Sequence, residues 1–303
     1  MDATLLIGEK PFRQLDSRSW DVARRLEDMD RDDVAIQVLS PMPELLSYWL
    51  DVQGAEVLCD HVNSQIGEII AASPGRFKGL GALPLQNPTD SMRYLQRIRD
   101  NFGLLGVEIG SNINGRLLGD RIFDPFWEAA ETLEMAVFVH ALHPVAVKSL
   151  DVTPVFTAFA GFPIDVAMSA ASMMMEGTLL RFPKLRVGFS HGGGALSAIL
   201  GRLDKGWAAT SAFGIDGLEA PSTQAAKLFY DSNVYDPATL AHAVTVMAPG
   251  HVFAGSDYPY LIQQENLAAF LASTGLAATE IDSLREGAAR KFLKSKFEAL
   301  SPM

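Results

Sequence analysis

Residues 187–196, VGFSHGGGAL, decide how the rest of the chain is interpreted. A run of apolar residues stops at His191, an ionisable side chain, and three glycines follow at once. A histidine within a strand core would need a hydrogen-bond partner or would lose its charge. At the carboxyl end of a strand it can instead face a cleft and take part in chemistry. The next question is whether other strands of this chain end in the same way.

Short β-branched runs alternate with helical periodicity along the chain. The expected strands are 34–39, 77–84, 105–110, 135–140, 185–190, 228–231 and 252–255, and the clearest helices span 51–72, 163–182 and 236–247. Near-continuous apolar strands in this order are typical of a parallel sheet that is covered on both faces. No linker or change in composition divides the chain, so we expect one α/β domain over residues 1–303.

A doubly wound sheet and a barrel both agree with this order of elements. An open nucleotide-binding sheet usually has a glycine-rich turn after its first strand, and none occurs here. Polar residues follow several strands in succession, namely Ser40, Asn112, His140, His191, Asp231 and Asp257. The carboxyl ends of barrel strands converge on the active site. The polar strand ends therefore favour a barrel.

The composition excludes several classes of function. A formal net charge of −11 without a Lys/Arg cluster argues against a nucleic-acid or anionic-membrane partner. The single cysteine, Cys59, excludes an intramolecular disulfide and a thiolate zinc cluster. We see no signal peptide and no segment as uniformly apolar as a membrane span requires, so we expect a cytoplasmic protein. An acidic small-molecule substrate remains possible, because one or two arginines can dominate a pocket locally.

Three of the polar strand ends together suggest chemistry. His140 ends the strand in FVHALHP, His191 precedes the glycines, and Asp257 follows a strand in VFAGSDYPY. Taken alone, each residue is more often a hydrogen-bonded structural residue or a turn former. Together, imidazole and carboxylate suit a zinc-like divalent metal, and an unligated histidine nearby suits proton transfer.

The segments FVHALHP, RFPKLRVGFSHGGGALSAILGRLDKGW and HVFAGSDYPY resemble the amidohydrolase-related decarboxylases typified by aminocarboxymuconate-semialdehyde decarboxylase. RRLEDMDRDDVAIQVLSPMP extends the resemblance towards the N-terminus. The resemblance implies a distorted (β/α)₈ TIM barrel of the amidohydrolase type and one divalent metal, zinc or manganese. It also implies that His140 and Asp257 are metal ligands, that Asp257 belongs to the catalytic group, and that His191 is the acid/base beside a metal-bound water.

The chain departs from the family pattern at its beginning. Those enzymes start with a strand ending in His-x-His, which supplies two more metal ligands, and the first histidine here is His61. We therefore expect a barrel without its first strand, in which residues 1–16 form the family's hairpin arm. Either the chain continues upstream of Met1 or it is a divergent member with a weakened metal site. We favour the first of these, because His140, His191 and Asp257 are all present.

The resemblance also assigns two arginines and a reaction. Arg13 matches an arginine that binds the substrate carboxylate, and Arg202 matches one that reaches the neighbouring subunit's active site, so we expect a homodimer. The implied reaction is non-oxidative decarboxylation of an unsaturated or aromatic carboxylic acid. Alternatives are a hydrolase or hydratase on the same fold, because the fold does not determine the reaction, and a metal-free pseudoenzyme.

Overall fold

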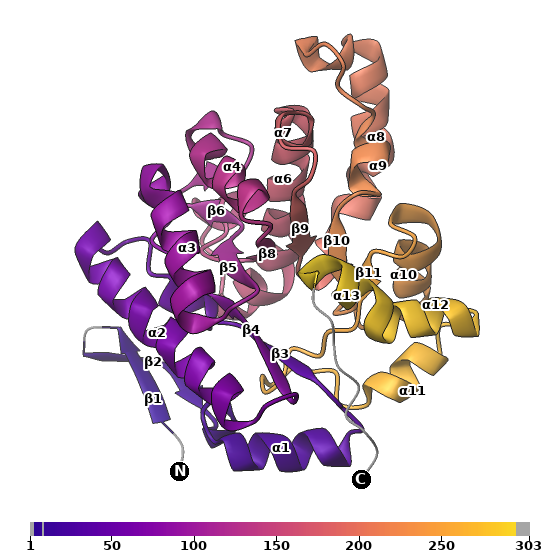
Figure 1. The fold of residues 1–303 in the computed structure, drawn as a ribbon. Coiled ribbons are helices and arrows are strands. Elements are labelled where there is room, and N and C mark those ends of the chain that lie inside the picture. Colours follow the sequence, from indigo (N-terminus) through magenta and orange to yellow (C-terminus); the bar gives the residue numbers. More distant parts are fainter. Residues whose placement is uncertain (1–2, 8, 295–303) are drawn as a thin grey trace.

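The architecture is a curled sheet of seven parallel strands surrounded by helices (Figure 1). A computed structural model describes residues 3–7 and 9–294. The strand order is β11-β10-β9-β8-β5-β4-β3, so each neighbour along the sheet is also the neighbouring parallel strand in sequence. This is the arrangement of a (β/α) barrel opened at one place, and it confirms the predicted fold class.

All seven strands predicted from sequence are present, each somewhat shorter than expected. They are β3 Gln37–Leu39, β4 Phe77–Gly81, β5 Gly106–Gly110, β8 Ala136–His140, β9 Arg186–Phe189, β10 Phe229–Asp231 and β11 Val252–Phe253. Two antiparallel hairpins lie outside this sheet: β1 Ala3–Ile7 with β2 Lys10–Leu15, and β6 Asn112–Ile113 with β7 Arg116–Leu117. The first of these hairpins occupies the segment expected to form the arm.

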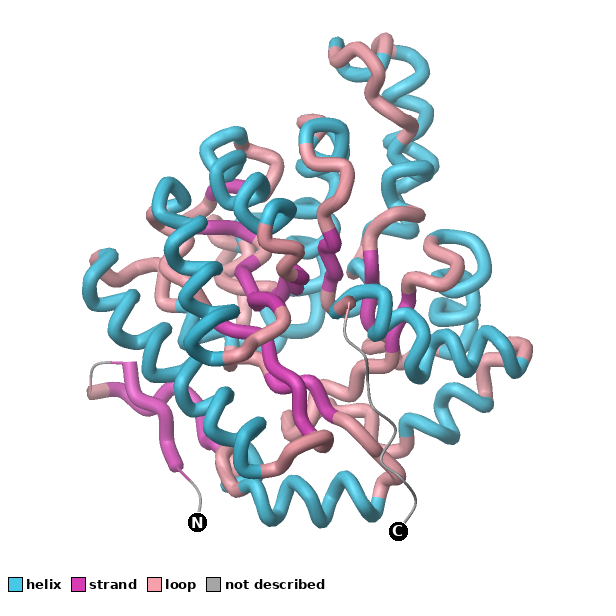
Figure 2. The backbone as a smooth tube through the Cα atoms, viewed as in Figure 1, coloured by secondary structure: helices cyan, strands magenta, loops and turns pink. Residues whose placement is uncertain are grey.

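Helices cover the outer face of the curled sheet (Figure 2). They are α1 Val22–Arg31, α2 Val52–Ala72, α3 Ser91–Phe102, α4 Asp124–Thr132, α5 Pro154–Phe156, α6 Phe162–Met175, α7 Thr178–Arg181, α8 Leu196–Ala209, α9 Pro221–Ala225, α10 Pro237–His242, α11 Leu267–Ala272, α12 Ala278–Asp282 and α13 Ala288–Leu293. Asp51 and Asp236 cap α2 and α10 by accepting the backbone N–H of Gly54 and Thr239 at 2.8 and 2.7 Å. These caps explain why the sequence predicts both starts correctly.

The helix predicted over 163–182 is two helices. α6 ends at Met175, and Gly177 adopts a φ of 69°, which starts the separate helix α7. The helical stretch Pro154–Met175 is also long and apolar enough to cross a membrane by length and composition, contrary to our expectation. Val166, Ala170 and Met173 are buried in the core, so packing on the barrel accounts for the apolar residues on one face of α6. Phe156 and Phe159, earlier in the same stretch, are exposed.

The alternation of side chains along the strands divides the interior into two layers. On β8, Val137 and Val139 face the helices, whereas Phe138 and His140 face the inside of the curl. Phe138 lies in a small apolar cluster with residues of other strands, including Leu80, Phe229 and Phe253. This cluster fills the lower part of the barrel. His140 lies above this cluster, at the carboxyl end of its strand.

Within the described residues, the barrel does not close, as the strand count predicted. β3 and β11 are the two ends of the sheet, and each pairs with only one neighbour in it. Side chains from α1 bridge this gap instead of a strand. Arg25 donates to Gln37 Oε1 on β3 at 2.8 Å, and its guanidinium lies 4.8 Å from the ring centroid of Tyr258, which follows β11.

Candidate active site

His140 ends β8 and faces the inside of the curl. Its Nδ1 lies 2.9 Å from the carbonyl oxygen of Ala141, so this nitrogen is the donor and Nε2 keeps a free lone pair. Burial, together with the neighbouring His191, lowers the pKa of His140 to about 3. The imidazole is therefore neutral near pH 7, which is the form that binds metals and accepts protons.

His191 lies beside His140, with 5.1 Å between the two ring centroids. Its ring also stacks on Phe162, and Ser190 Oγ lies 3.0 Å from its Nδ1. Burial lowers the pKa of His191 to about 4. The residue adopts a φ of 56°, which is uncommon for a residue with a side chain. The backbone therefore turns sharply at this point, and the imidazole is directed into the site.

The three glycines after His191 make this turn possible. Gly192, Gly193 and Gly194 have φ values of 61°, 80° and 60°. A Cβ on Gly194 would lie 1.9 Å from the carbonyl oxygen of Pro163, at the start of α6. Glycine is needed here both for its conformation and for the close approach of two backbones. This explains why an ionisable residue is followed by three glycines.

Two aspartates complete the rim of the site. Asp231 ends β10 and accepts the backbone N–H of Gly192 at 2.8 Å, which links this strand to the glycine turn. Asp257 follows β11 with a φ of 59°. Burial and the charge of Asp231 raise the pKa of Asp257 to about 7, while Arg13 opposes the shift. Asp231 holds the turn in place, and Asp257 is the carboxylate with no hydrogen bond described to its side chain.

Arg13, one of the two predicted substrate-binding arginines, is part of this region. It lies on β2 of the N-terminal hairpin and forms an ion pair with Glu44, Nη2 to Oε1, at 2.8 Å. Its guanidinium also lies 5.4 Å from the ring centroid of Tyr260, three residues after Asp257. The hairpin therefore brings a cation to the barrel mouth, where the charge of Arg13 influences both His140 and Asp257.

Arg202 lies apart from these residues. It is exposed on α8, which projects away from the barrel (Figure 1). Within the described chain it forms no ion pair. The structure of one chain thus does not bring Arg202 to its own site, and a role in a partner's site stays a prediction.

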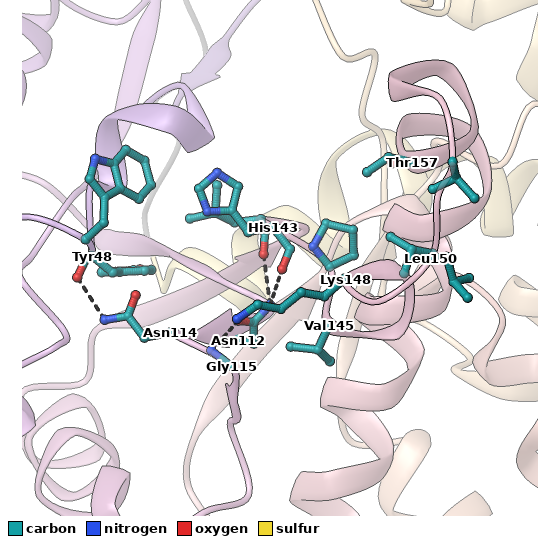
Figure 3. Close-up of a pocket in the computed structure, with 14 residues that line it drawn as sticks. Tyr48, Asn112, Asn114, Gly115, His143, Val145, Lys148, Leu150 and Thr157 are labelled. Atoms are coloured by element: carbon teal, nitrogen blue, oxygen red, sulfur yellow. Dashed lines mark hydrogen bonds between the residues drawn. The ribbon is translucent and has the colours of Figure 1, made fainter. Parts of the chain in front are cut away.

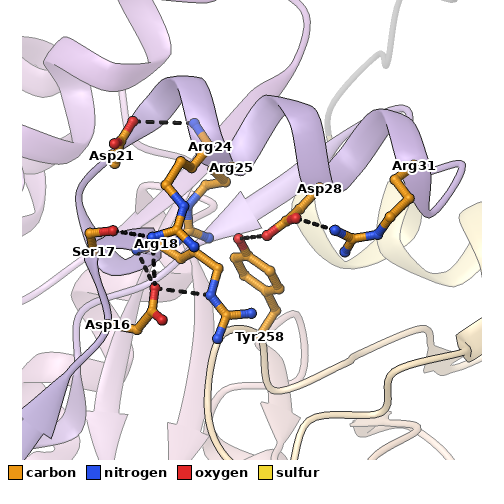
Figure 4. Close-up of polar contacts among 9 residues, drawn as sticks. All are labelled: Asp16, Ser17, Arg18, Asp21, Arg24, Arg25, Asp28, Arg31 and Tyr258. Carbon is orange, nitrogen blue, oxygen red and sulfur yellow. Dashed lines mark hydrogen bonds and ion pairs between the residues drawn. The ribbon is translucent and has the colours of Figure 1, made fainter. Parts of the chain in front are cut away.

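The segment after Asp257 is held by an aromatic clamp, by which we mean Tyr258 with Arg18, Arg25 and Asp28 (Figure 4). The Tyr258 hydroxyl donates to Asp28 Oδ2 at 2.7 Å, and the guanidinium groups of Arg18 and Arg25 lie 5.6 and 4.8 Å from its ring centroid. Arg25 is 9% exposed and also donates to the carbonyl oxygen of Arg18 at 2.8 Å. Sequence reasoning missed this clamp, because its members are far apart in the chain.

A cavity of about 470 Å³ opens beside the loops that follow β5 and β8 (Figure 3). Trp49 and His143 line it with their ring centroids 4.9 Å apart, and Asn114 and Lys148 supply polar groups. His143 lies only three residues after His140. The cavity itself is not lined by His140, His191 or Asp257, so it adjoins the histidine pair rather than containing it.

Sequence reasoning also missed Glu108, a buried acid on β5 that is 2% exposed. The signal was present in GVEIG, where one carboxyl group interrupts an otherwise apolar strand. Burial raises the pKa of Glu108 to about 8, and the charges of Asp257 and Glu44 act in the same direction. A carboxyl group therefore lies inside the barrel, close to the site and within reach of its electrostatic field.

The side chains at the barrel mouth are of the chemical types that bind divalent metal ions. His140 offers a neutral imidazole nitrogen and Asp257 a carboxylate, which are ligands that zinc and manganese accept. Over residues 3–7 and 9–294, no group of three His, Cys, Asp or Glu side chains is close enough to hold one ion.

Comparison with known proteins gives consistent matches. The family model described as amidohydrolase matches residues 5–294. The 2-amino-3-carboxymuconate-6-semialdehyde decarboxylase of Dictyostelium discoideum is 36% identical over 261 residues, which are 85% of this chain and 72% of that protein. Among solved structures, 5-carboxyvanillate decarboxylase from Sphingomonas paucimobilis matches with a TM-score of 0.83 and 25% identity, covering 90% of this chain and 83% of that one.

A second solved structure bears on the fold. Dihydroxybenzoic acid decarboxylase from Polaromonas sp. JS666, which contains manganese and the inhibitor 2-nitroresorcinol, matches with a TM-score of 0.79 and 20% identity, covering 91% of this chain and 88% of that one. The match of the family model over nearly the whole chain, the 36% identical relative and the curled parallel sheet agree with one another. This chain belongs to the amidohydrolase family, alongside relatives that are carboxy-lyases.

Proposed function

We propose that this protein is a non-oxidative decarboxylase of an unsaturated or aromatic carboxylic acid. The observation that supports this most directly is the meeting of Arg13, His140, His191 and Asp257 at the carboxyl ends of the barrel strands. The relatives described above are decarboxylases of such acids, which favours decarboxylation over hydrolysis or hydration on the same fold. A cytoplasmic homodimer acting on a small molecule remains part of this proposal.

In the proposed reaction, Arg13 binds and orients the substrate through a carboxylate. A guanidinium can bind a planar carboxylate through two hydrogen bonds while it keeps its charge. The adjoining cavity beside Trp49 and His143 has room for the remainder of a small ring or chain. The substrate would thus be anchored at its charged end and extend along an apolar, partly aromatic wall.

His191 holds and moves the proton that the reaction requires. The proton is delivered to the carbon that carries the carboxyl group. When the bond to that group then breaks, its electron pair returns to the ring or chain as CO₂ leaves. The buried imidazole is neutral in the free protein, but an anionic substrate beside it favours the protonated form. His191 therefore gains its proton as the acid binds and delivers it to carbon.

We further propose that His140 and Asp257 are the residues that hold a divalent metal ion, zinc or manganese. When bound, such an ion polarises substrate oxygen atoms and stabilises negative charge that develops on them. The free Nε2 lone pair of His140 and the uncommitted Asp257 carboxylate support this assignment. Binding of Mn²⁺ and Zn²⁺ by calorimetry, compared with a His140→Ala variant, tests it.

The function is tested by measuring CO₂ release in the presence of Mn²⁺ or Zn²⁺. The panel includes 2,6-dihydroxybenzoate, 5-carboxyvanillate and unsaturated dicarboxylic acids, and the His191→Ala variant is the control. In D₂O, the product should contain one deuterium on the carbon that carried the carboxyl group. Release of CO₂ by the parent and not by the variant supports the proposal. Hydrolysis or hydration products without CO₂ would contradict it.

A further inference from the structure

Asp165, on α6, is a buried acid that the proposed reaction does not use. Its side chain is 0% exposed, and a buried carboxyl group is costly unless its oxygen atoms accept hydrogen bonds. Its partners come from the ends of two neighbouring strands. Ser111 and Asn112 follow β5, and Val145 lies in the loop after β8. Asp165 therefore lies where the two loops on either side of the His140 strand end meet.

Both carboxyl oxygens of Asp165 accept hydrogen bonds. Oδ1 accepts the backbone N–H of Val145 at 2.7 Å. Oδ2 accepts the side-chain amide of Asn112 at 3.0 Å and the hydroxyl group of Ser111. The amide of Asn112 also donates to two carbonyl oxygens of the loop after β8, at 2.9 and 3.2 Å (Figure 3). Asp165 thus holds this loop both directly and through Asn112.

Ser111 continues the series of hydrogen bonds towards His140. Its Oγ accepts the backbone N–H of Leu142 at 3.3 Å, so the hydroxyl hydrogen is the one that points to Asp165. The N–H of Leu142 and the carbonyl group of Ala141 belong to one planar peptide group. That carbonyl oxygen lies 2.9 Å from Nδ1 of His140. A carboxyl group, a hydroxyl group, a peptide group and an imidazole are therefore joined in sequence.

We propose that Asp165 positions His140 through Ser111 and the peptide group at 141–142, a series that we call the Asp165 relay. This inference rests on the proposed function, since it takes Nε2 of His140 as the nitrogen that binds the metal ion. A hydrogen bond to the other ring nitrogen of a metal-binding histidine fixes its tautomer and its orientation. Here a peptide carbonyl accepts that hydrogen bond, and the relay holds the peptide group in the orientation that allows it.

The burial of the relay strengthens this effect. Ser111 and Leu142 are 0% and 5% exposed, and hydrogen bonds in series polarise one another where water is excluded. Burial also lowers the pKa of His140 to about 3, so near pH 7 its ring carries a single hydrogen. If that hydrogen were on Nε2, the lone pair of Nδ1 would face the carbonyl oxygen of Ala141, and two acceptors would repel each other. The relay therefore keeps the hydrogen on Nδ1 and the lone pair on Nε2.

The test compares Ser111→Ala with Ser169→Ala, the same substitution at two positions that are both 0% exposed. Ser169 lies on α6 one turn after Asp165, and its Oγ has no hydrogen-bond partner among the residues that the structure describes. NMR of the metal-free protein with ¹⁵N-labelled histidine shows which ring nitrogen of His140 carries the hydrogen. The signal is assigned by its loss in His140→Gln. The parent and Ser169→Ala should show the Nδ1–H form, whereas Ser111→Ala should show a mixture of the two forms.

Mn²⁺ binding and thermal unfolding separate the relay from a structural role. Calorimetry should show that Ser111→Ala and Asp165→Asn bind Mn²⁺ about tenfold more weakly than the parent, as is typical when a group that orients a metal ligand is lost. Ser169→Ala should bind Mn²⁺ like the parent. If Asp165→Asn does not fold, the two serine variants still decide the question. A lower melting temperature of Ser111→Ala with a parent-like tautomer would show that the relay serves the fold alone and would overturn the proposal. Unchanged Mn²⁺ affinity despite mixed tautomers would overturn it as well.

The outcomes also distinguish the relay from the proposed function. Release of CO₂ by a parent whose His140 is in the Nε2–H form would overturn the relay and leave the function intact. Mixed tautomers and weaker Mn²⁺ binding in Ser111→Ala, with no CO₂ released by the parent, would support the relay and contradict the decarboxylase assignment. If the parent binds neither Mn²⁺ nor Zn²⁺ and releases no CO₂, the proposed function fails, and the NMR comparison alone decides whether the relay holds the tautomer.

Discussion

His191 and Asp257 share an unusual backbone conformation, with φ values of 56° and 59° at the two residues assigned to chemistry. Residues with side chains adopt this region at a cost, so the surrounding structure must hold them there. At His191 the glycine turn does so, through the N–H of Gly192 bonded to Asp231. At Asp257 the clamp on Tyr258 does so. Both side chains are thus positioned by neighbours that take no part in the reaction.

Replacing His191 and replacing Asp257 should have different effects on activity and on metal binding. His191→Ala should lose decarboxylation by about 10²- to 10⁴-fold, the contribution of a positioned acid/base, while Mn²⁺ binding is unchanged. Asp257→Ala should lose activity together with Mn²⁺ affinity, and His140→Ala should behave likewise. Rate measurements paired with metal titrations check this. Loss of Mn²⁺ binding in His191→Ala, with both properties intact in Asp257→Ala, would reverse the assigned roles.

Glu108 should leave a signature in the pH dependence of stability. Its folded pKa of about 8 lies above its ordinary value, so between about pH 4.5 and 8 the folded state binds the proton that the unfolded state has lost. The contribution of Glu108 to folding stability therefore falls as the pH rises through this window, by up to about 1.4 kcal/mol per pH unit.

Glu108→Gln has no carboxyl group to titrate, so its advantage in melting temperature over the parent should grow between pH 5 and pH 8. Thermal unfolding of both proteins at several pH values measures this. Glu265→Gln is the control, because it makes the same substitution at an exposed position. Parallel profiles for the parent and Glu108→Gln would show that Glu108 titrates as an ordinary acid.

Among the elements, α1 connects the two ends of the open sheet, which strand pairing does elsewhere in the barrel. Arg25 and Asp28 lie on the same helix and contact both ends of the open sheet, at Gln37 on β3 and at Tyr258 after β11. The helix thereby couples the position of the Asp257 loop to the edge of the sheet. A substitution in this contact should therefore change the position of Asp257, although the substituted residue does not contact the substrate.

Tyr258→Phe should show this coupling. The substitution removes the hydrogen bond to Asp28 and keeps the ring beside Arg18 and Arg25, so stability should fall by only about 1 kcal/mol. We expect kcat to fall more than KM rises, because Asp257 loses its position while Arg13 still binds substrate. Asp28→Asn should have a similar effect, and the double variant should be no worse than either single one. Additive losses would show that the two residues act separately.

The elements that the sequence predicts well are those with local signals. All seven strands are visible as apolar runs, and the helices expected over 51–72 and 236–247 begin within one residue of α2 and α10. The break at Gly177 was missed because the apolar pattern continues across it. The clamp was missed for another reason: its members are distant in sequence and meet only when the sheet curls. Local patterns thus predict elements, but contacts across the barrel mouth need the fold.

At the scale of the whole molecule, the projecting helix α8 and its Arg202 bear on whether two subunits share their sites. Arg202 is exposed on it and lies away from its own site, as expected of a residue that serves a partner subunit. Arg202→Ala and His191→Ala chains should each be inactive alone. Mixed under conditions that exchange subunits, they should recover up to about a quarter of the parent activity, since a mixed dimer has one intact site if sites are shared. No recovery after exchange has been demonstrated by labelled subunits would argue against a shared site.

The contact between Gly194 and the Pro163 carbonyl oxygen sets a limit on how this sequence can vary. In a saturation-mutagenesis library scored by folding, nearly every replacement at position 194 should be depleted, because even one methyl group would collide with backbone at 1.9 Å. Position 201, where an added Cβ meets nothing within 4 Å, should accept alanine freely. Two glycines seven residues apart would then have opposite tolerance profiles, and a designer altering the specificity of the site would have to leave the first untouched.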